Sequence, residues 1–521
     1  MAKVFTRIKI DKIWYGWVGL ARMSDGKRIL IKWGALPWSI VDLRIVKQKK
    51  DYIEAHITHV QELDPKIVDG EIFCPHFFSL LSSNEANKEP RKIGCGGCKW
   101  QMLSYGNQLK LKEDIVNDAF TKIKKKLPDL HVLSIIGSPE EKKYRNKIEF
   151  SFGKYITKNA EWVNEALSDR SVGFHKQGEF SKIIDIQNCA LISDEANEIL
   201  QHIQQLCRAS WLPVHDQMTH QWFFRHLVIR EWTNTQQFLV NLSLSDKSLN
   251  EDTTKKRNIL LELLKIDEFL QNKVSTFVIT YNNGLADIIR SQDCHTETIR
   301  GEWSIYEKLL FKKWQETLGE TITDTKKTAI ENVYEISFRV SPFSFFQTNT
   351  LWAQQLFSQA MKMVGNIEGT ILDLYCGTWT IGISFLKVGK GNKLVGIEIV
   401  EEAITDARYN AKINGLEDKV IFLANPAEKA FTQTPEIKDK IKNLGLVIID
   451  PPRDGLHKNV VQMICDLKKQ SDFKLLYISC NPVTMVRDIE LFIQWWFNIK
   501  EIQPVDMFPQ THHIECIWVL S

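Results

Sequence analysis

Three short apolar runs in the last third of the chain end in residues that can do chemistry. Runs of this length, closed by Pro, Gly or Asn, predict buried strands. In an open α/β sheet, ligands bind at the carboxyl ends of the strands, so the three strand ends predict one site. The runs and their ends are Leu475–Ile478 with Ser479-Cys480-Asn481-Pro482, Leu446–Ile449 with Asp450-Pro451-Pro452-Arg453, and Ile371–Leu374 with Tyr375-Cys376-Gly377-Thr378.

Cys480 is the candidate nucleophile of this edge. A single cysteine is more often a small buried hydrophobe than a reactive thiol, so its assignment depends on the neighbouring motifs. One of these is the turn Tyr375–Gly382, followed about twenty residues later by Glu398, which is placed to accept a hydrogen bond from a ribose hydroxyl. NAD is one possible ligand, but Trp379 stands where the pyrophosphate-binding pattern needs its second glycine. S-adenosylmethionine has no pyrophosphate, so its binding depends less on the glycine pattern of this turn.

Length and composition predict several domains in a soluble, cytoplasmic protein. The chain has 521 residues, 44% of them hydrophobic and 25% charged, and a net charge of only +3. It shows neither an N-terminal signal core nor a long uncharged apolar run, so no membrane partner is expected. In a reducing compartment, its ten cysteines are expected to be ligands, nucleophiles or core residues rather than disulfides.

The first 64 residues predict a small barrel of the OB type, which is common among RNA-binding proteins. Twelve basic and seven acidic residues, together with Trp14, Tyr15 and Trp17 as exposed aromatic residues, favour contact with an RNA backbone. A basic barrel that binds no RNA is the alternative. The five expected strands are Val4–Ile10, Trp17–Ala21, Arg28–Trp33, Asp42–Val46 and Tyr52–Val60.

Four cysteines have the pattern of a metal site. Cys95 and Cys98 enclose two glycines, which lets the loop curl around a metal ion or a cluster. Cys74 is the candidate third ligand and Cys189 the fourth. The polar insert Phe77–Ile93 would loop out between Cys74 and Cys95. Zinc and iron–sulfur both suit four thiolates, whereas a thioredoxin-like redox pair lacks its strand-and-helix context. A second polar insertion is expected at Leu310–Val333.

Several motifs, taken together and in order, carry a resemblance to a known family. They are Ser341–Asn349, Asp373–Gly377, Asp450–Arg453, Ser479–Pro482 and Asp506–Thr511 through Glu515. The chain resembles the RNA uridine C5-methyltransferases, most specifically the iron–sulfur enzymes that methylate 23S ribosomal RNA. Tyr144-Arg145-Asn146-Lys147 and Gly173-Phe174-His175-Lys176 are similar to the central domain of that family.

The resemblance implies an architecture and a set of site residues. A TRAM barrel would span residues 1–64, a central α+β domain with a [4Fe–4S] cluster 65–345, and a Rossmann-like methyltransferase domain 346–521. The protein would be a monomer that binds 23S ribosomal RNA. Cys480 would be the nucleophile and Glu515 the base. S-adenosylmethionine would be bound by Gln347, Tyr375, Gly377, Thr380, Glu398 and Asp450, and the cluster by Cys74, Cys95, Cys98 and Cys189.

The chemistry needs these residue types independently of the resemblance. C5 of uracil attacks a methyl sulfonium only after a thiolate has added to C6, and a base must then remove the C5 proton. Glu515, in the apolar stretch Ile514–Leu520, suits the base because its neighbours should raise its pKa. The target base must also leave its stack to reach such a pocket.

Other functions remain open at this point. A transfer RNA uridine is an alternative substrate. An RNA cytosine C5-methyltransferase would place a second cysteine in the Asp450–Arg453 motif, and an N6-adenine methyltransferase would want an aromatic residue at Arg453. A non-catalytic RNA-binding factor on the same fold is a further alternative, which depends on Trp379 and Pro426 in the cofactor region.

Overall fold

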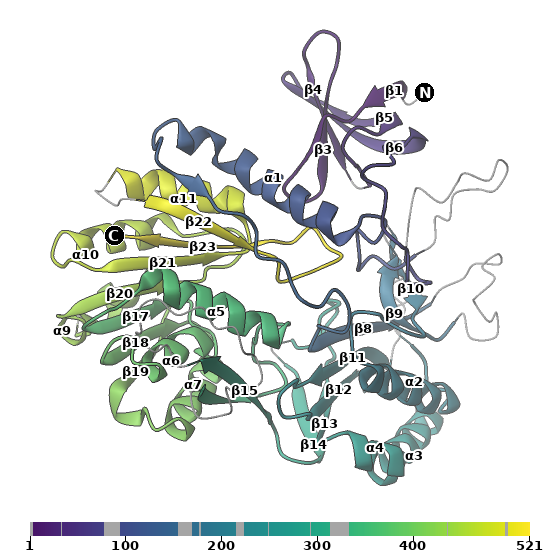
Figure 1. Ribbon diagram of the computed structural model, residues 1–521. Helices are drawn as coiled ribbons and strands as arrows, with labels where there is room; N and C mark the ends of the chain where they lie inside the picture. Colours follow the sequence, from purple (N-terminus) through teal and green to yellow (C-terminus); the bar gives the residue numbers. More distant parts are fainter. Residues whose placement is uncertain are drawn as a thin grey trace, which may run out of the picture.

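The computed structural model has an N-terminal unit, a central unit and a C-terminal unit (Figure 1). The polar insert after Phe77 lies outside the described residues, and so do residues 313–332 of the insertion expected at Leu310–Val333. The ends of that second insertion belong to two paired strands, β15 (Ile305–Lys312) and β16 (Val333–Val340). The residues described are 4–32, 34–77, 94–154, 169–176, 179–214, 223–247, 249–291, 293–312, 333–434, 436–494 and 499–521.

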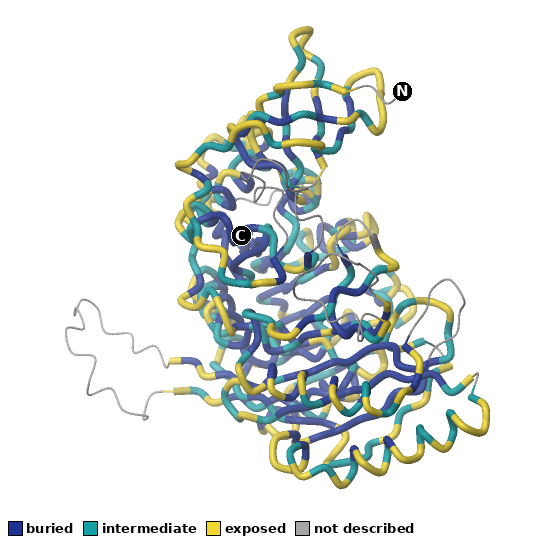
Figure 2. Tube along the Cα trace, turned by 90° about the vertical axis from the view of Figure 1, so that its right-hand side faces the viewer, coloured by how far each residue is buried: buried dark blue, intermediate teal, exposed yellow. Residues whose placement is uncertain are grey.

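The N-terminal unit is a six-stranded sheet whose loops are largely exposed (Figure 2). All five expected strands are present within a few residues, and the short β2 is additional. Alternating buried residues, among them Ile29, Ile31 and Leu43, form its small core. In the order β1-β5-β6-β4-β3-β2, the strands are β1 (Val4–Lys9), β5 (Ile40–Gln48), β6 (Tyr52–Glu62), β4 (Arg28–Lys32), β3 (Val18–Arg22) and β2 (Lys12–Trp14).

The expectation of three exposed aromatic residues in this unit is wrong for Trp17. Trp14 is 39% exposed, but Trp17 is only 4% exposed and its Nε1 donates a hydrogen bond to the Ala35 carbonyl at 2.7 Å. The turn between β2 and β3 faces the rest of the protein, and this buries the indole. Tyr15, in the same turn, is half-buried.

The central unit is a mainly antiparallel seven-stranded sheet with helices packed on it (Figure 1). Strands β11, β12 and β13 are buried almost throughout, because both faces of the sheet are covered. The helices are α2 (Asp194–Ala209), α3 (Glu251–Ile266) and α4 (Glu268–Lys273). In sheet order, the strands are β10 (Glu179–Asp185), β9 (Ser171–Lys176), β8 (Lys147–Gly153), β11 (Phe224–Glu231), β12 (Phe238–Leu244), β13 (Thr276–Tyr281) and β14 (His295–Arg300).

The C-terminal unit is an eight-stranded sheet, parallel except for β23, with helices on both faces (Figure 1). The strands that contain the three apolar runs, β17, β20 and β21, are direct parallel neighbours. In sheet order, the strands are β19 (Val420–Ala424), β18 (Lys393–Glu398), β17 (Thr370–Leu374), β20 (Leu444–Ile449), β21 (Lys474–Ser479), β23 (Glu515–Leu520), β22 (Ile499–Val505) and β7 (His131–Val132). The helices are α5 (Thr350–Val364), α6 (Thr380–Lys387), α7 (Glu401–Ile413), η2 (Glu417–Lys419), α8 (Ala430–Gln433), α9 (Ile437–Lys440), α10 (Lys458–Lys468) and α11 (Pro482–Ile493).

Residues 105–132 lie within the stretch 65–345 that the sequence assigns to a central domain, but they pack with the C-terminal unit. Strand β7 pairs in parallel with β22, and helix α1 (Tyr105–Lys124) packs against α11. None of the helices within the described ranges combines the length and the hydropathy that crossing a bilayer requires.

Helix α1 holds the loop 506–511 through a fully buried ion pair. Lys112 Nζ lies 2.6 Å from Asp506 Oδ1, and both side chains are 0% exposed. Lys112 also donates to the Phe508 carbonyl at 3.1 Å, and the Tyr105 hydroxyl donates to Asp506 Oδ2 at 3.0 Å. Burial lowers the pKa of Lys112, whereas the Asp506 carboxylate opposes that change. The pair is therefore stable only while both partners are present.

Replacing Lys112 with Met should destabilise the protein by about 3–5 kcal/mol, because the Asp506 carboxylate would stay buried without its cation. The double variant Lys112→Met/Asp506→Asn should recover much of this loss, since the buried charge is gone. Lys12→Met is the control: it removes the exposed pair between Lys12 and Asp118 and should cost less than about 1 kcal/mol. Urea unfolding followed by fluorescence measures all three. Equal midpoints for Lys112→Met and the wild type would contradict the prediction.

Candidate functional site

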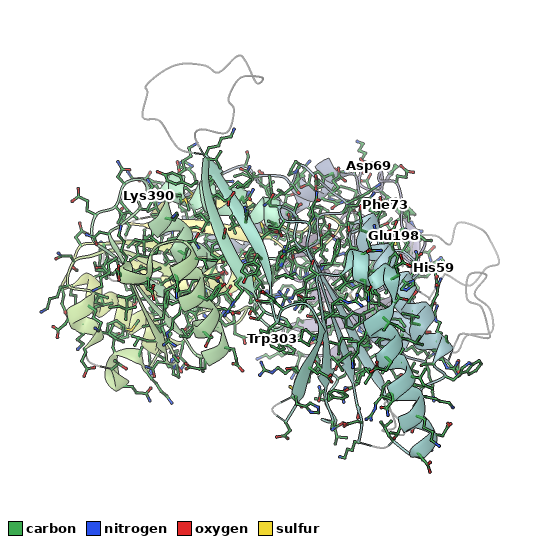
Figure 3. All side chains as sticks on the ribbon, turned by 90° about the horizontal axis from the view of Figure 1, so that it is seen from below. His59, Asp69, Phe73, Glu198, Trp303 and Lys390 are labelled. Atoms are coloured by element: carbon green, nitrogen blue, oxygen red, sulfur yellow. The ribbon has the colours of Figure 1, made fainter. Side chains whose placement is uncertain are left out.

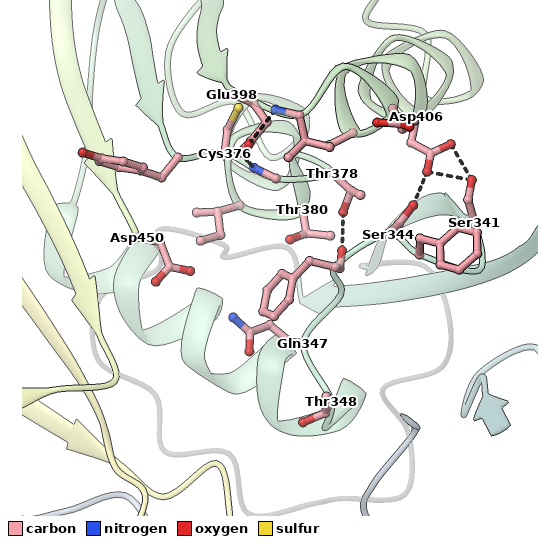
Figure 4. A pocket seen from close by; sticks show the side chains of 18 of the residues that line it. Ser341, Ser344, Gln347, Thr348, Cys376, Thr378, Thr380, Glu398, Asp406 and Asp450 are labelled. Atoms are coloured by element: carbon pink, nitrogen blue, oxygen red, sulfur yellow. Dashed lines mark hydrogen bonds between the residues drawn. The ribbon is translucent and has the colours of Figure 1, made fainter. Parts of the chain in front are cut away.

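All eight residues predicted to bind the cofactor or act in catalysis line one cavity of about 1160 Å³. The cavity lies at the carboxyl ends of β17, β20 and β21, where the C-terminal sheet faces the central unit, and several of its residues appear in Figure 4. The lining includes Gln347, Tyr375, Gly377, Thr380, Glu398, Asp450, Cys480 and Glu515. Trp303, from the central unit, lines it on the opposite side and lies where the two units meet (Figure 3).

Strand register brings Cys480 and Glu515 to the same edge. Cys480 follows the last residue of β21, and Glu515 is the first residue of the antiparallel neighbour β23. Ser479 pairs with Cys516, so the next residues along the two strands, Cys480 and Glu515, meet across this end of the ladder.

The Cys480 loop is tied to the neighbouring strand end by Asn481. The Asn481 side chain caps helix α11 by accepting from the backbone N–H groups of Val483 and Thr484, and its Nδ2 donates to the Arg453 carbonyl at 2.9 Å. Pro482 opens the helix, where a missing N–H costs nothing. The nucleophile loop and the Asp450–Arg453 loop are therefore one connected structure.

Burial dominates the electrostatics of both candidate catalytic residues. Burial raises the pKa of Cys480 to about 11, with smaller contributions from the carboxylates of Glu515 and Asp450, while Arg453 acts in the opposite direction. Burial, followed by Asp450, also raises the pKa of Glu515 well above its usual value, as its apolar neighbours predict. The Glu515 side chain is suited to taking up a proton, and the Cys480 thiol must lose one before it can attack.

The turn after β17 is shaped by three residues with positive φ. These are Tyr375 at 61°, Gly377 at 51° and Trp379 at 72°. Glu398, at the end of β18, accepts the Gly377 N–H at 3.0 Å and the N–H groups of Ile399 and Val400 at 2.9 and 3.0 Å. The carboxylate is thus held at the rim of the cavity, with lone pairs left for a ligand.

The four candidate metal ligands line a second cavity of about 410 Å³. Cys74, Cys95, Cys98 and Cys189 all contribute to its wall, and Cys95 Sγ accepts the Gly97 N–H at 3.2 Å. Across the described ranges of the chain, no group of three or more His, Cys, Asp or Glu side chains is placed to hold a metal ion. Arg145, Thr348 and His513 line both cavities, so the two sites share a wall.

Comparison with known proteins identifies the family. Residues 282–521 match the family described as tRNA (Uracil-5-)-methyltransferase. An uncharacterized RNA methyltransferase of Caldanaerobacter subterraneus subsp. tengcongensis is 30% identical over 515 residues, which is 99% of this chain and 98% of the relative. The chain belongs to the RNA uracil-5-methyltransferase family. A Clostridium acetobutylicum RNA methyltransferase is also 30% identical, over 98% of this chain and 96% of its own length.

The whole fold of this methyltransferase is similar to that of a solved structure. The tRNA (uracil-54, C5)-methyltransferase of Pyrococcus abyssi, solved with S-adenosyl-L-homocysteine, superposes with a TM-score of 0.64. The likeness covers 99% of this chain and 100% of the other at 21% identity. The expectation of an RNA uracil-5-methyltransferase is thus confirmed at the level of the family.

The unusual Trp379 of this methyltransferase points away from the cavity. Its ring is fully buried, and its centroid lies 3.9 Å from that of Phe422. It occupies the space above Gly396, where an added Cβ would lie 1.0 Å from the indole. Neither Trp379 nor Pro426 is among the residues that line the cavity. The two residues that supported a non-catalytic alternative therefore leave the cavity open.

Helix α7 of the methyltransferase carries polar positioning residues that sequence reasoning missed. Asp406 accepts from Ser341 Oγ at 2.8 Å and also from Ser344 (Figure 4). It accepts from Arg339 Nη2 at 2.8 Å as well. Asn410 Oδ1 accepts the Arg339 N–H at 2.7 Å, and Asn414, one helical turn further on, accepts the Ser337 N–H. The spacing of four residues between these polar groups was a signal in the sequence, because it places them on one helix face. The hydrogen bonds from these groups hold in place the motif Ser341–Asn349, which carries Gln347.

Asp373 is a second residue whose role was missed. Its side chain is 2% exposed and lines the cavity, and Oδ2 has no hydrogen-bond partner among the described residues. Burial, then the nearby Asp450, raises the pKa of Asp373 well above its usual value. The signal was an acidic residue inside an otherwise apolar strand, which is costly unless something pairs with it.

Gly396→Ala should destabilise the methyltransferase by about 3 kcal/mol or more, because the new methyl group overlaps the Trp379 indole and the core is closely packed. In a Trp379→Gly background the same substitution should cost little, and this non-additivity identifies the contact. Gly106→Ala is the matched control, since nothing lies within 4 Å of its added Cβ. Thermal unfolding measures all variants. Equal losses from Gly396→Ala in both backgrounds would refute the contact.

Proposed function

We propose that this protein transfers a methyl group from S-adenosylmethionine to C5 of a uridine in RNA, with 23S ribosomal RNA as the substrate. The observation that carries the proposal is that Cys480 and Glu515 lie next to the paired residues Ser479 and Cys516 at one strand edge, and line a cavity that also contains the candidate cofactor residues. A thiol and a carboxyl with a raised pKa, facing the same space, suit addition and proton removal on one base.

The reaction assigns one role to each catalytic residue. The Cys480 thiolate adds to C6 of uracil, which places carbanion character on C5. C5 then forms a bond to the methyl carbon, and the bond between that carbon and the cofactor sulfur breaks. Glu515 removes the C5 proton, and the Cys480–C6 bond breaks to release 5-methyluridine. Arg453 favours the thiolate, since its positive charge lowers the pKa of Cys480.

The cavity suits a cofactor with positive charge. S-adenosylmethionine supplies a methyl group on a sulfonium and also carries an ammonium group. The unpaired Oδ2 of Asp373 and the carboxyl of Asp450 offer acceptors for such a ligand, and burial raises the pKa of Asp450 to about 7. A bound cation would favour the charged carboxylates. Glu398, at the end of β18, would bind the ribose, and Tyr375 and Gln347 would complete the cofactor site.

The N-terminal unit supports RNA as the substrate. Its six strands and its excess of basic residues are consistent with a TRAM or OB barrel that contacts the phosphate backbone. A transfer RNA uridine is the rival substrate. Mapping of 5-methyluridine by mass spectrometry in ribosomal and transfer RNA, with and without the gene, decides between them. We expect the loss of 5-methyluridine from 23S ribosomal RNA.

We further propose that Cys74, Cys95, Cys98 and Cys189 bind one [4Fe–4S] cluster. Four thiols around a single cavity fit the ligand set of such a cluster. A cluster spreads its thiolates over different irons, whereas zinc needs all four around a single ion. Zinc is the rival metal for this site, because a single zinc ion also accepts four thiolate ligands. The cluster would tie residues 74–98 to the central unit, with a structural role.

Cys480→Ala should abolish methyl transfer and leave the affinities for RNA and S-adenosylhomocysteine within a few-fold, because only the nucleophile is lost. Glu515→Gln should accumulate an enzyme–RNA adduct that survives denaturation, since the C5 proton stays in place. The control is Cys465→Ala, a buried cysteine in α10. Radiolabelled methyl transfer and denaturing gels provide the measurements. Turnover by Cys480→Ala would overturn the nucleophile, and a Glu515→Gln variant that binds RNA without forming an adduct would overturn the base.

Anaerobically purified protein should be brown and contain about four irons per chain. Cys189→Ser should lower the iron content and the visible absorption, because one ligand is lost. Cys207→Ser is the matched control: Cys207 is buried in α2 and does not line the cavity. Metal analysis and visible spectra provide the readout. Stoichiometric zinc without iron would refute the cluster, and unchanged iron in Cys189→Ser would refute that ligand.

A further inference from the structure

A side chain of the N-terminal unit reaches the nucleophile loop of the C-terminal unit. The Tyr15 hydroxyl, in the turn between β2 and β3, donates a hydrogen bond to the backbone carbonyl of Cys480 at 3.1 Å. The two residues are 465 positions apart in the chain. Burial raises the pKa of Tyr15 to about 12, so its hydroxyl remains a donor at any working pH.

The turn that carries Tyr15 is firmly attached to the catalytic half of the protein. Gly16 and Trp17 both have positive φ, 78° and 59°, which is unusual for a tryptophan and fixes the direction of the turn. Ile13 and Trp17 belong to the same hydrophobic cluster as Trp100 and residues of the C-terminal unit. Because this packing is buried, it fixes the position of the Tyr15 hydroxyl relative to the nucleophile loop.

The other bonds that shape the nucleophile loop come from the C-terminal unit itself. Ser479 Oγ accepts the Asn481 N–H at 3.1 Å, Asn481 Nδ2 donates to the Arg453 carbonyl, and Thr484 Oγ1 donates to the same carbonyl at 3.2 Å. These bonds hold the residues on either side of Cys480. Arg453 hydrogen-bonds to the Cys480 side chain. The bond from Tyr15 holds the peptide group that follows Cys480, and so limits the backbone conformation from which the thiol projects.

We propose that Tyr15 is a positioning residue for methyl transfer, which orients the Cys480 thiol toward C6 of the target uracil. The proposal rests on the proposed function, in which Cys480 is the nucleophile. It also gives the N-terminal unit a second role. The basic, strand-rich unit that would hold RNA also completes the nucleophile loop, so a correctly seated N-terminal unit is needed for an active Cys480.

Tyr15→Phe tests the proposal, because it removes the hydroxyl and keeps the ring. The probe is 23S ribosomal RNA transcribed with 5-fluorouridine. Cys480 can add to C6 and C5 can accept the methyl group, but fluorine replaces the proton that Glu515 would remove. The Cys480–C6 bond then persists, and the adduct is counted on a denaturing gel. The rate of adduct formation at saturating RNA and cofactor should fall about 10-fold, the order expected when a reacting group is slightly misplaced.

Three further measurements separate positioning from binding and folding. The RNA concentration for half-maximal rate, the affinity for S-adenosylhomocysteine and the melting temperature should match those of the wild type. Tyr52→Phe is the matched control: it removes a hydroxyl from the same unit, where Tyr52 hydrogen-bonds to Glu54 rather than to the nucleophile loop. It should form adduct at the wild-type rate.

Each outcome has a distinct meaning. Adduct formation by Tyr15→Phe at the wild-type rate overturns the role of Tyr15 and leaves the proposed function intact. A loss that appears only as weaker RNA binding, with an unchanged rate at saturation, also overturns positioning. Failure of the wild-type protein to form any adduct with ribosomal or transfer RNA transcripts would instead refute the proposed function.

Discussion

The buried ion pair between Lys112 and Asp506 is the contact on which the candidate site depends most. It joins helix α1 to the loop 506–511. The Gln108 side chain strengthens this connection, because it donates to Gln510 Oε1 and accepts from the Gln510 backbone N–H. The loop leads directly into β23, whose first residue is Glu515. Separating the two charges would leave each of them buried without its partner, which is strongly destabilising. The ion pair therefore holds the loop in one position. The position of the Glu515 carboxyl group therefore depends on contacts made outside β23, the strand that carries it.

A similar logic applies on the opposite side of the cavity. The polar face of α7, formed by Asp406, Asn410 and Asn414, binds the backbone and side chains between Ser337 and Ser344. Asn146 of the central unit donates to the Gln347 carbonyl at 2.9 Å and so fastens the end of the same segment. Buried polar groups of this kind are costly unless every partner is present. The cavity wall is therefore shaped by networks that are complete only when the central and C-terminal units are packed together.

Much of this site could be predicted from local sequence. The apolar runs before Tyr375, Asp450 and Cys480 indicated buried strands, and parallel strands bring their carboxyl ends to one edge. The order of the motifs was enough to indicate the family, which the relatives confirm. The burial of Trp17 and the direction of the Trp379 indole could not be predicted in this way. Each depends on a partner, Ala35 or Gly396, that local patterns do not connect to it.

The sequence by itself determined which residues carry the chemistry and which strands present them, because strand ends, turns and ligand spacings are local properties of the chain. The tertiary structure decided which other residues they contact. Strand register sets Glu515 beside Cys480, and packing of the first unit brings Tyr15 to the Cys480 carbonyl. Both contacts join residues far apart in the chain. Their geometry follows from the burial of whole surfaces and from the pairing of buried polar groups, which no short stretch of sequence encodes.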